Sequence, residues 1–209
     1  MGKLLWAMFT RNLRSVASLG IIFGVTVAAR ADVLLDTFTG PNNGVGGNGW
    51  FSSDPTLSFY RPFTVSGTFA FDSLTVALFA MGNNVAPTVN LDLTLYADNG
   101  GTPGTVLEAF HQTIGKPLSL YTVNSLTHPI LTSGTYYVAV GNATDVWCWV
   151  IPSDQHIGPW GTGHPGSWDP SHNTSFDITA RVNASPVPEP ASVLALGLGA
   201  AALVRRRKR

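Results

Sequence analysis

The central part of the chain consists of short runs of β-branched and aromatic residues separated by turn residues. In the clearest run, VNLDLTLY at residues 89–96, apolar and polar side chains alternate, so that its valine and its three leucines share one face. Alternation at a period of two is typical of a strand with one buried face. Residues 32–187 contain no sustained helical period. This pattern excludes a helical bundle and predicts an all-β domain.

Further runs of the same kind predict the other strands, and Gly, Pro and Asn mark the turns between them. Asn99, Gly100 and Gly101 tolerate positive φ, which predicts a hairpin turn. We expect Asp98 to belong to this hairpin, because the other ligands of a calcium loop are missing. Antiparallel strands at this spacing are typical of a β-sandwich or jelly roll. The expected strands are residues 56–71, 74–79, 89–96, 105–111, 119–123, 134–140, 145–151 and 175–182.

An uncharged apolar stretch and a basic cluster follow the predicted β domain. The apolar stretch, residues 191–204, has Ser192 as its one polar side chain. A helix of this length covers about 21 Å, which is short for a hydrocarbon core of about 30 Å. A buried helix of a soluble domain is the alternative, although the stretch has no polar face. Cations beside an apolar segment favour the cytoplasmic side. The basic stop comprises Arg205, Arg206, Arg207, Lys208 and Arg209.

A Val-Pro-Glu-Pro motif precedes the apolar stretch, and the three features together resemble the PEP-CTERM sorting signal of exported bacterial proteins. The resemblance implies an exosortase in the inner membrane that cleaves near the motif. It also implies transfer of the preceding domain to the cell surface or extracellular matrix of a Gram-negative bacterium. The motif residues would be acted upon and would not be catalytic. They are Val187, Pro188, Glu189 and Pro190.

The N-terminal residues have the pattern of a signal peptide. Cations precede an apolar core at residues 15–27, and small residues follow that core. We expect signal peptidase to read Ala29 and Ala31 and to cleave after Ala31, whereas an uncleaved anchor or an amphipathic helix is the alternative. The predicted organisation is a signal-peptide helix in residues 1–31, a β-sandwich domain in residues 32–186, and a sorting segment with a short hydrophobic helix in residues 187–209.

The charges are distributed unevenly between the central domain and its flanking segments. The chain has 12 basic and 12 acidic residues, a formal net charge of +0. Residues 32–187 hold three cations, Arg61, Lys116 and Arg181, against eleven carboxylates, which gives a formal charge of −8. Phosphates attract Lys and Arg, so this domain does not suit nucleic acid or anionic lipid. Its charge allows polysaccharide, cations and other proteins as partners.

No motif of a known enzyme class occurs in the sequence. It lacks Gly-x-Ser-x-Gly, a phosphate-binding loop, His-Glu-x-x-His and the dinucleotide fingerprint. Glu108 is the only glutamate of the central domain, so a glycosidase would need aspartate pairs such as Asp92 with Asp98, or Asp169 with Asp177. The single cysteine, Cys148, is expected to be a small buried hydrophobe in a strand. We therefore predict a noncatalytic protein without a cofactor.

The most unusual internal stretch is residues 151–176, which is rich in Gly and Pro. Its histidines and aspartates could bind a metal, although a spacing of eight in a loop does not enforce convergence, and no metal site is predicted. Alternatively, Trp160 and Trp168 could offer flat faces to sugar rings beside Asp169, as in a carbohydrate-binding module of an exopolysaccharide matrix. The expected interpretation is a packed surface loop whose tryptophans cover one edge of the sandwich. The histidines are His156, His164 and His172.

A second resemblance concerns the middle of the domain. A strand that ends in Leu95-Tyr96, the turn DNGGTPG at residues 98–104 and the later GTYY at residues 134–137 are similar to the choice-of-anchor R domain of bacterial surface proteins. The resemblance implies a β-sandwich carried on interchangeable anchors, and it implies no activity. The favoured function is therefore that of an exported, noncatalytic surface or matrix protein. Sugar binding is the alternative, and a secreted hydrolase without a recognisable motif is the third class.

Overall fold

The fold is known from a computed structural model, which describes residues 31–38, 45–52, 54, 56–81, 87–152, 158–169, 178–188 and 197. Residues 31–187 form one compact unit. Within the described ranges of that unit the regular structure consists of β-strands, which pair into two antiparallel sheets. The prediction of an all-β, antiparallel fold is confirmed. The two predicted flanking helices fall outside the described residues, apart from Ala31 and Gly197.

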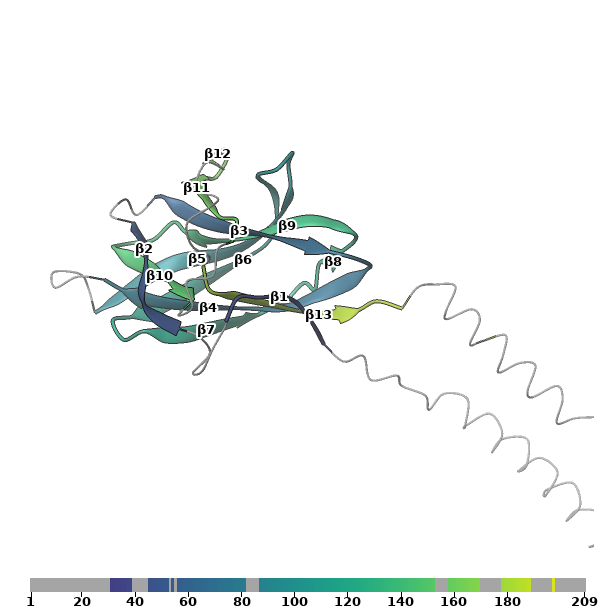
Figure 1. Ribbon diagram of the computed structural model, residues 1–209, viewed down its shortest axis with the longest axis horizontal. Helices are drawn as coiled ribbons and strands as arrows, with labels where there is room; N and C mark the ends of the chain where they lie inside the picture. Colours follow the sequence, from purple (N-terminus) through teal and green to yellow (C-terminus); the bar gives the residue numbers. More distant parts are fainter. Residues whose placement is uncertain are drawn as a thin grey trace, which may run out of the picture. The chain divides into compact units, whose positions relative to one another are not determined.

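The first sheet, sheet A, has seven strands (Figure 1). These are β1 (Asp32–Asp36), β2 (Val45–Ser52), β4 (Phe69–Ala80), β7 (Ser119–Asn124), β8 (Ile130–Leu131), β10 (Trp147–Pro152) and β13 (Ala180–Pro186). The main order is β1-β13-β4-β10-β2. Strand β4 pairs with β13 and β10 along one edge, and with β7 and β8 along the other.

The second sheet, sheet B, has the order β12-β11-β3-β9-β5-β6. Its strands are β3 (Ser58–Val65), β5 (Thr88–Asp98), β6 (Pro103–Gly115), β9 (Gly134–Gly141), β11 (Gly161–His164) and β12 (Ser167–Asp169). The turn between β5 and β6 is the predicted hairpin, with φ of 67° at Gly100 and 94° at Gly101. The Asp98 carboxylate accepts hydrogen bonds from the Gly101 N–H and the Tyr137 hydroxyl, so it serves the turn itself.

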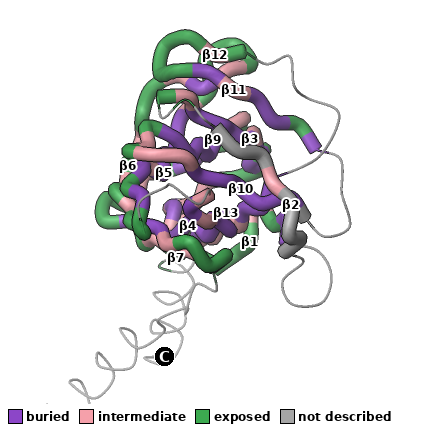
Figure 2. The backbone as a smooth tube through the Cα atoms, turned by 90° about the vertical axis from the view of Figure 1, so that its left-hand side faces the viewer, coloured by how far each residue is buried: buried purple, intermediate pink, exposed green. Residues whose placement is uncertain are grey.

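One hydrophobic core joins the two sheets (Figure 2). The alternation predicted for residues 89–96 is confirmed, because the valine and the three leucines of that run are all buried in this core. Strand β4 contributes Phe71 and Leu74 from sheet A, and β9 contributes Val138 from sheet B. Side chains of both sheets thus meet in a single buried layer, and the fold is β-sandwich-like.

The observed strands differ from the predicted ones in several places, among them the short β8, which was not predicted, and β13, which begins and ends later than the predicted run at residues 175–182. The run predicted over residues 56–71 is divided, because Gly67 has a φ of +113° and turns the chain from β3 in sheet B to β4 in sheet A. The stretch at residues 151–176 contains β11 and β12, which were not predicted because the stretch is rich in glycine and proline. Strands β1 and β2 were not predicted, since β1 is short and β2, with the sequence VGGNGWFS, is rich in glycine.

Candidate functional site at the end of strand β13

The Val-Pro-Glu-Pro motif begins where β13 leaves sheet A. Pro186, opposite Phe69 of β4, is the last residue of the ladder. The N–H of Val187 then donates a hydrogen bond to the Thr68 carbonyl at 2.9 Å. Pro188 is exposed and has no N–H, so sheet pairing cannot continue through it. No spacer therefore separates the folded strand from the motif.

Side-chain contacts fix the same end of β13. The Ser185 hydroxyl donates to the Asp72 carboxylate of β4 at 2.6 Å. Two residues earlier on β13, the Asn183 amide donates a hydrogen bond to the Ser73 hydroxyl at 3.0 Å. The ring of His128 lies 3.6 Å from the Asp72 carboxylate. β13 is thus held against β4 almost to the residue where the motif begins.

The predicted signal-peptide junction lies beside this site. Strand β1 begins at Asp32, directly after the exposed Ala31, and lies beside β13 (Figure 1). Asp32 pairs with Ala184 of β13. Val187 is three residues further along β13, so Asp32 and Val187 are about 11 Å apart by the rise and spacing of paired strands. Both ends of the compact unit therefore leave sheet A at the same end of its strands.

Other predicted targeting residues are not covered by the structure. Ala29, Glu189, Pro190 and the basic stop at residues 205–209 lie outside the described residues. Within the part of the chain that the structure describes, no helix has the length and hydropathy needed to cross a membrane. The hydrophobic helix of residues 191–204 stays a prediction.

The structure separates the two tryptophans that were considered as a sugar platform. Trp160 is 4% exposed and packs in the core against Phe59, with ring centroids 6.0 Å apart. A buried indole cannot stack on a sugar ring, so the assignment of Trp160 to a sugar-binding surface is wrong. Trp168 is partly exposed and belongs to a different cluster, where it packs edge-on against Tyr60 and Tyr96. Beside it, Asp169 is exposed.

The histidines and carboxylates of the same region form no metal site among the described residues. The Nδ1 atom of the exposed His164 lies 3.0 Å from the Thr56 carbonyl oxygen. His156 and His172 lie outside the described residues.

Asp92 and Asp98, the first aspartate pair predicted for glycosidase chemistry, lie too far apart for it. Asp92 and Asp98 are both on β5, six residues from each other, which corresponds to about 20 Å. Paired catalytic carboxylates of glycosidases are separated by about 5–9.5 Å. Moreover, Asp92 accepts a hydrogen bond from the Asn142 amide and contacts Nδ1 of His111. Asp177, the predicted partner of Asp169, lies outside the described residues.

Cys148 has the predicted character of a buried hydrophobe. Its side chain is 2% exposed in β10, and it is a free cysteine. Burial raises the pKa of its thiol to about 12. The thiolate required of a nucleophile is therefore scarce at neutral pH.

Glu108 has a structural role that the sequence did not indicate. This carboxylate is 7% exposed in β6 and accepts hydrogen bonds from the Ser125 hydroxyl at 2.6 Å and from the Leu126 and Thr127 N–H groups. Burial raises the pKa of Glu108, but these hydrogen bonds outweigh burial and hold the pKa below its ordinary value. The ionised side chain thereby fixes the loop between β7 and β8.

Comparison with known proteins identifies the motif at the end of β13. Residues 186–209 match a family model described as the PEP-CTERM protein-sorting motif. No curated protein and no solved structure matches the chain. The resemblance of the middle of the domain to the choice-of-anchor R family stays a prediction. A PEP-CTERM motif implies an exported protein that passes through the membrane and is processed by an exosortase. At residues 186–209, the chain therefore carries a PEP-CTERM protein-sorting motif.

Proposed function

We propose that this protein is a noncatalytic surface or matrix protein of a Gram-negative bacterium. An exosortase would cleave it near Pro188, Glu189 and Pro190 and deliver the β domain to the cell surface or the extracellular matrix. The observation that carries this proposal is the sorting motif, joined without a spacer to the last paired residue of a compact β domain.

The positions of the two ends of the domain support delivery from a membrane. Asp32 and Val187 lie at the same end of sheet A, so a signal peptide and an apolar tail could enter one bilayer together. Cations precede the first apolar segment and follow the second. Cations favour the cytoplasmic side, and this would place the β domain on the opposite side of the membrane.

The charge of the domain supports its release after cleavage. Residues 32–187 have a formal charge of −8, whereas the cations of the tail lie beyond the motif. Cleavage near the motif separates the acidic domain from these cations and from the apolar stretch. Anionic headgroups repel a surface of this charge, so nothing electrostatic retains the released domain at the membrane.

The noncatalytic part of the proposal is supported by the separation of Asp92 and Asp98 and by the burial of Cys148. Sugar binding has no observation in its favour, because Trp160 is buried and Trp168 packs on tyrosines. Polysaccharide is accordingly not proposed as a partner of these two residues.

The motif can be tested by replacing Pro188, Glu189 and Pro190 with alanine in a host that has the exosortase. We expect the variant to accumulate in the membrane fraction with its basic tail attached, since the enzyme would lose its recognition motif. Cell fractionation and immunoblotting measure the distribution. Pro117→Ala is the control, because this exposed proline lies outside residues 186–209 and should leave release unchanged. Equal release of the triple variant and the natural chain would refute the proposal.

A further inference from the structure

Exposed apolar side chains surround the place where both ends leave sheet A. Leu126 is 87% exposed, Ile130 is 55% exposed and Val33 is 53% exposed. They are three of the six large hydrophobic residues that are exposed in the described part of the chain. We call this surface the exit face and define it by the exposed Val33, Leu126 and Ile130 and the half-buried Val187.

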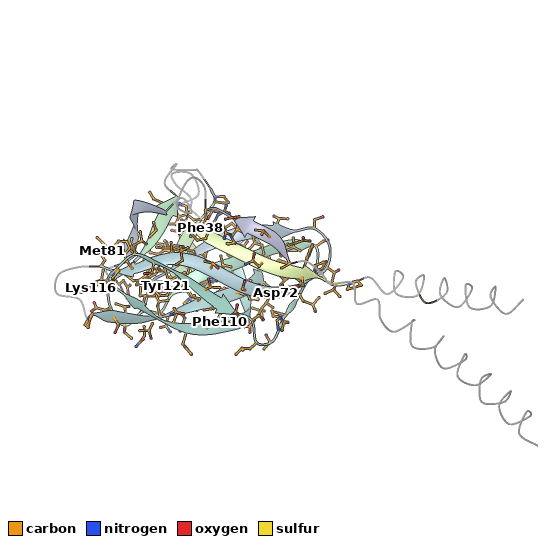
Figure 3. All side chains as sticks on the ribbon, turned by 90° about the horizontal axis from the view of Figure 1, so that it is seen from below. Phe38, Asp72, Met81, Phe110, Lys116 and Tyr121 are labelled. Carbon is orange, nitrogen blue, oxygen red and sulfur yellow. The ribbon has the colours of Figure 1, made fainter. Side chains whose placement is uncertain are left out.

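Sheet pairing places these residues close to one another. Ile130 lies opposite Ala70 of β4, and Ala70 lies opposite Ser185, two residues before Val187. Val33 pairs with Asn183 on the far side of β13. The exit face is thus the end of four neighbouring strands, β1, β13, β4 and β8. In Figure 3, Asp72 is labelled toward this end, and Met81 and Lys116 toward the other.

The backbone holds Leu126 in place. Its N–H donates to the buried Glu108 carboxylate at 2.8 Å, and the preceding residue, Ser125, donates its N–H to the Asp72 carbonyl at 2.7 Å. The leucine is therefore presented to solvent by a fixed loop. Covering an apolar side chain that is exposed to water lowers the free energy of the system.

The length of chain after Val187 indicates what that partner is. Val187 is bound to Thr68, and the apolar stretch begins at residue 191. Four residue steps span at most about 14 Å. The headgroup layer is about 5–8 Å thick on each side of the hydrocarbon core. A tail inserted from residue 191 therefore keeps Val187 within about 14 Å of the hydrocarbon core, which is in the headgroup layer or just outside it.

We propose that the exit face rests on the lipid bilayer while the tail is inserted, with Leu126 and Ile130 in the interfacial layer. This inference rests on the proposed function, since it requires the tail to be in the membrane. The short tether makes the contact intramolecular, so a small apolar area suffices. The carboxylates of Asp32 and Asp72 lie at the same end, and they favour zwitterionic over anionic headgroups.

The test uses the full chain in phosphatidylcholine vesicles, with an environment-sensitive fluorophore on Leu126→Cys. We expect its emission to shift to the blue and to be quenched by lipids that carry a spin label near the headgroup. Ile130→Cys, also at an exposed position, is a second labelling site. The matched control is Leu120→Cys, because Leu120 is 43% exposed and pairs with Ala77, about 23 Å along β4 from Ala70. Its probe should respond as it does in water.

The buried Cys148 should not take up the label, and the natural chain measures that background. Probes at positions 126 and 130 that stay unshifted in vesicles with which the chain floats would overturn the exit face alone. A shift that requires added exosortase would assign the surface to the enzyme and overturn the bilayer contact. A chain that does not float with vesicles at all would overturn the membrane anchor and this inference together.

Discussion

Replacing Trp149 with alanine is expected to lower the free energy of unfolding by about 3–5 kcal/mol. Trp149 is fully buried in β10, and its Nε1–H donates to the Thr179 carbonyl at 2.7 Å. The change removes the largest type of side chain from the core and leaves a buried carbonyl without its donor. Domains of this size have a total stability of about 5–15 kcal/mol, so much of it would be lost. Urea denaturation followed by circular dichroism measures the effect.

Trp168→Ala is the matched control for this prediction. Trp168 is partly exposed and packs on the outer tyrosine cluster, so its loss removes less buried area from the protein. We expect a clearly smaller fall in the urea midpoint. If the two variants were destabilised equally, the assignment of Trp149 to the common core of the sheets would be contradicted.

Replacing Glu108 with glutamine is expected to cost about 1.5–3 kcal/mol at neutral pH, the range for hydrogen bonds to a charged group. The ionised carboxylate accepts hydrogen bonds from Ser125, Leu126 and Thr127, and a neutral amide has one oxygen and an NH₂ that faces the donors. Urea denaturation at pH 7 measures the loss. Glutamine has nearly the same size as glutamate. The substitution therefore removes the negative charge and one acceptor oxygen but creates no cavity.

The same pair of proteins gives a prediction about pH. Because the folded protein holds the pKa of Glu108 below its ordinary value, the ionised group stabilises the fold above the pKa of the unfolded state. This contribution is lost as the pH falls through the folded pKa. The difference in stability between the natural chain and Glu108→Gln should therefore shrink at acidic pH. A difference that is constant with pH would contradict the role assigned to this carboxylate.

Local patterns predicted the parts of the fold that depend on neighbours in sequence. The alternation at residues 89–96 gave a strand with a buried face, and the glycines of the following turn gave the hairpin. The glycine-rich β2 and β11 were missed, because glycine has no side chain that reveals a period. The side of sheet B occupied by Trp160 depends on long-range packing, so the sequence could not separate it from Trp168.

The candidate site was also predictable only in part from the sequence. A linear sorting motif is read directly from residues 187–190, and the family match agrees with it. Its attachment to the sheet could not be predicted, because it depends on the pairing of Pro186 with Phe69 and of Ala184 with Asp32, more than a hundred residues away in each case. The role of Glu108 likewise depends on contacts with the loop that follows β7 in the chain, which the sequence does not reveal.

The intact mass of the protein recovered outside the membrane shows whether an exosortase has removed the tail. We expect a chain that begins at Asp32, ends close to Val187 or within the motif, and lacks the cations of residues 205–209. In cells without the exosortase, the same measurement should find only membrane-bound protein that retains those cations. Released protein that still carries the basic tail, or release that does not depend on the exosortase, would contradict processing by an exosortase at this motif.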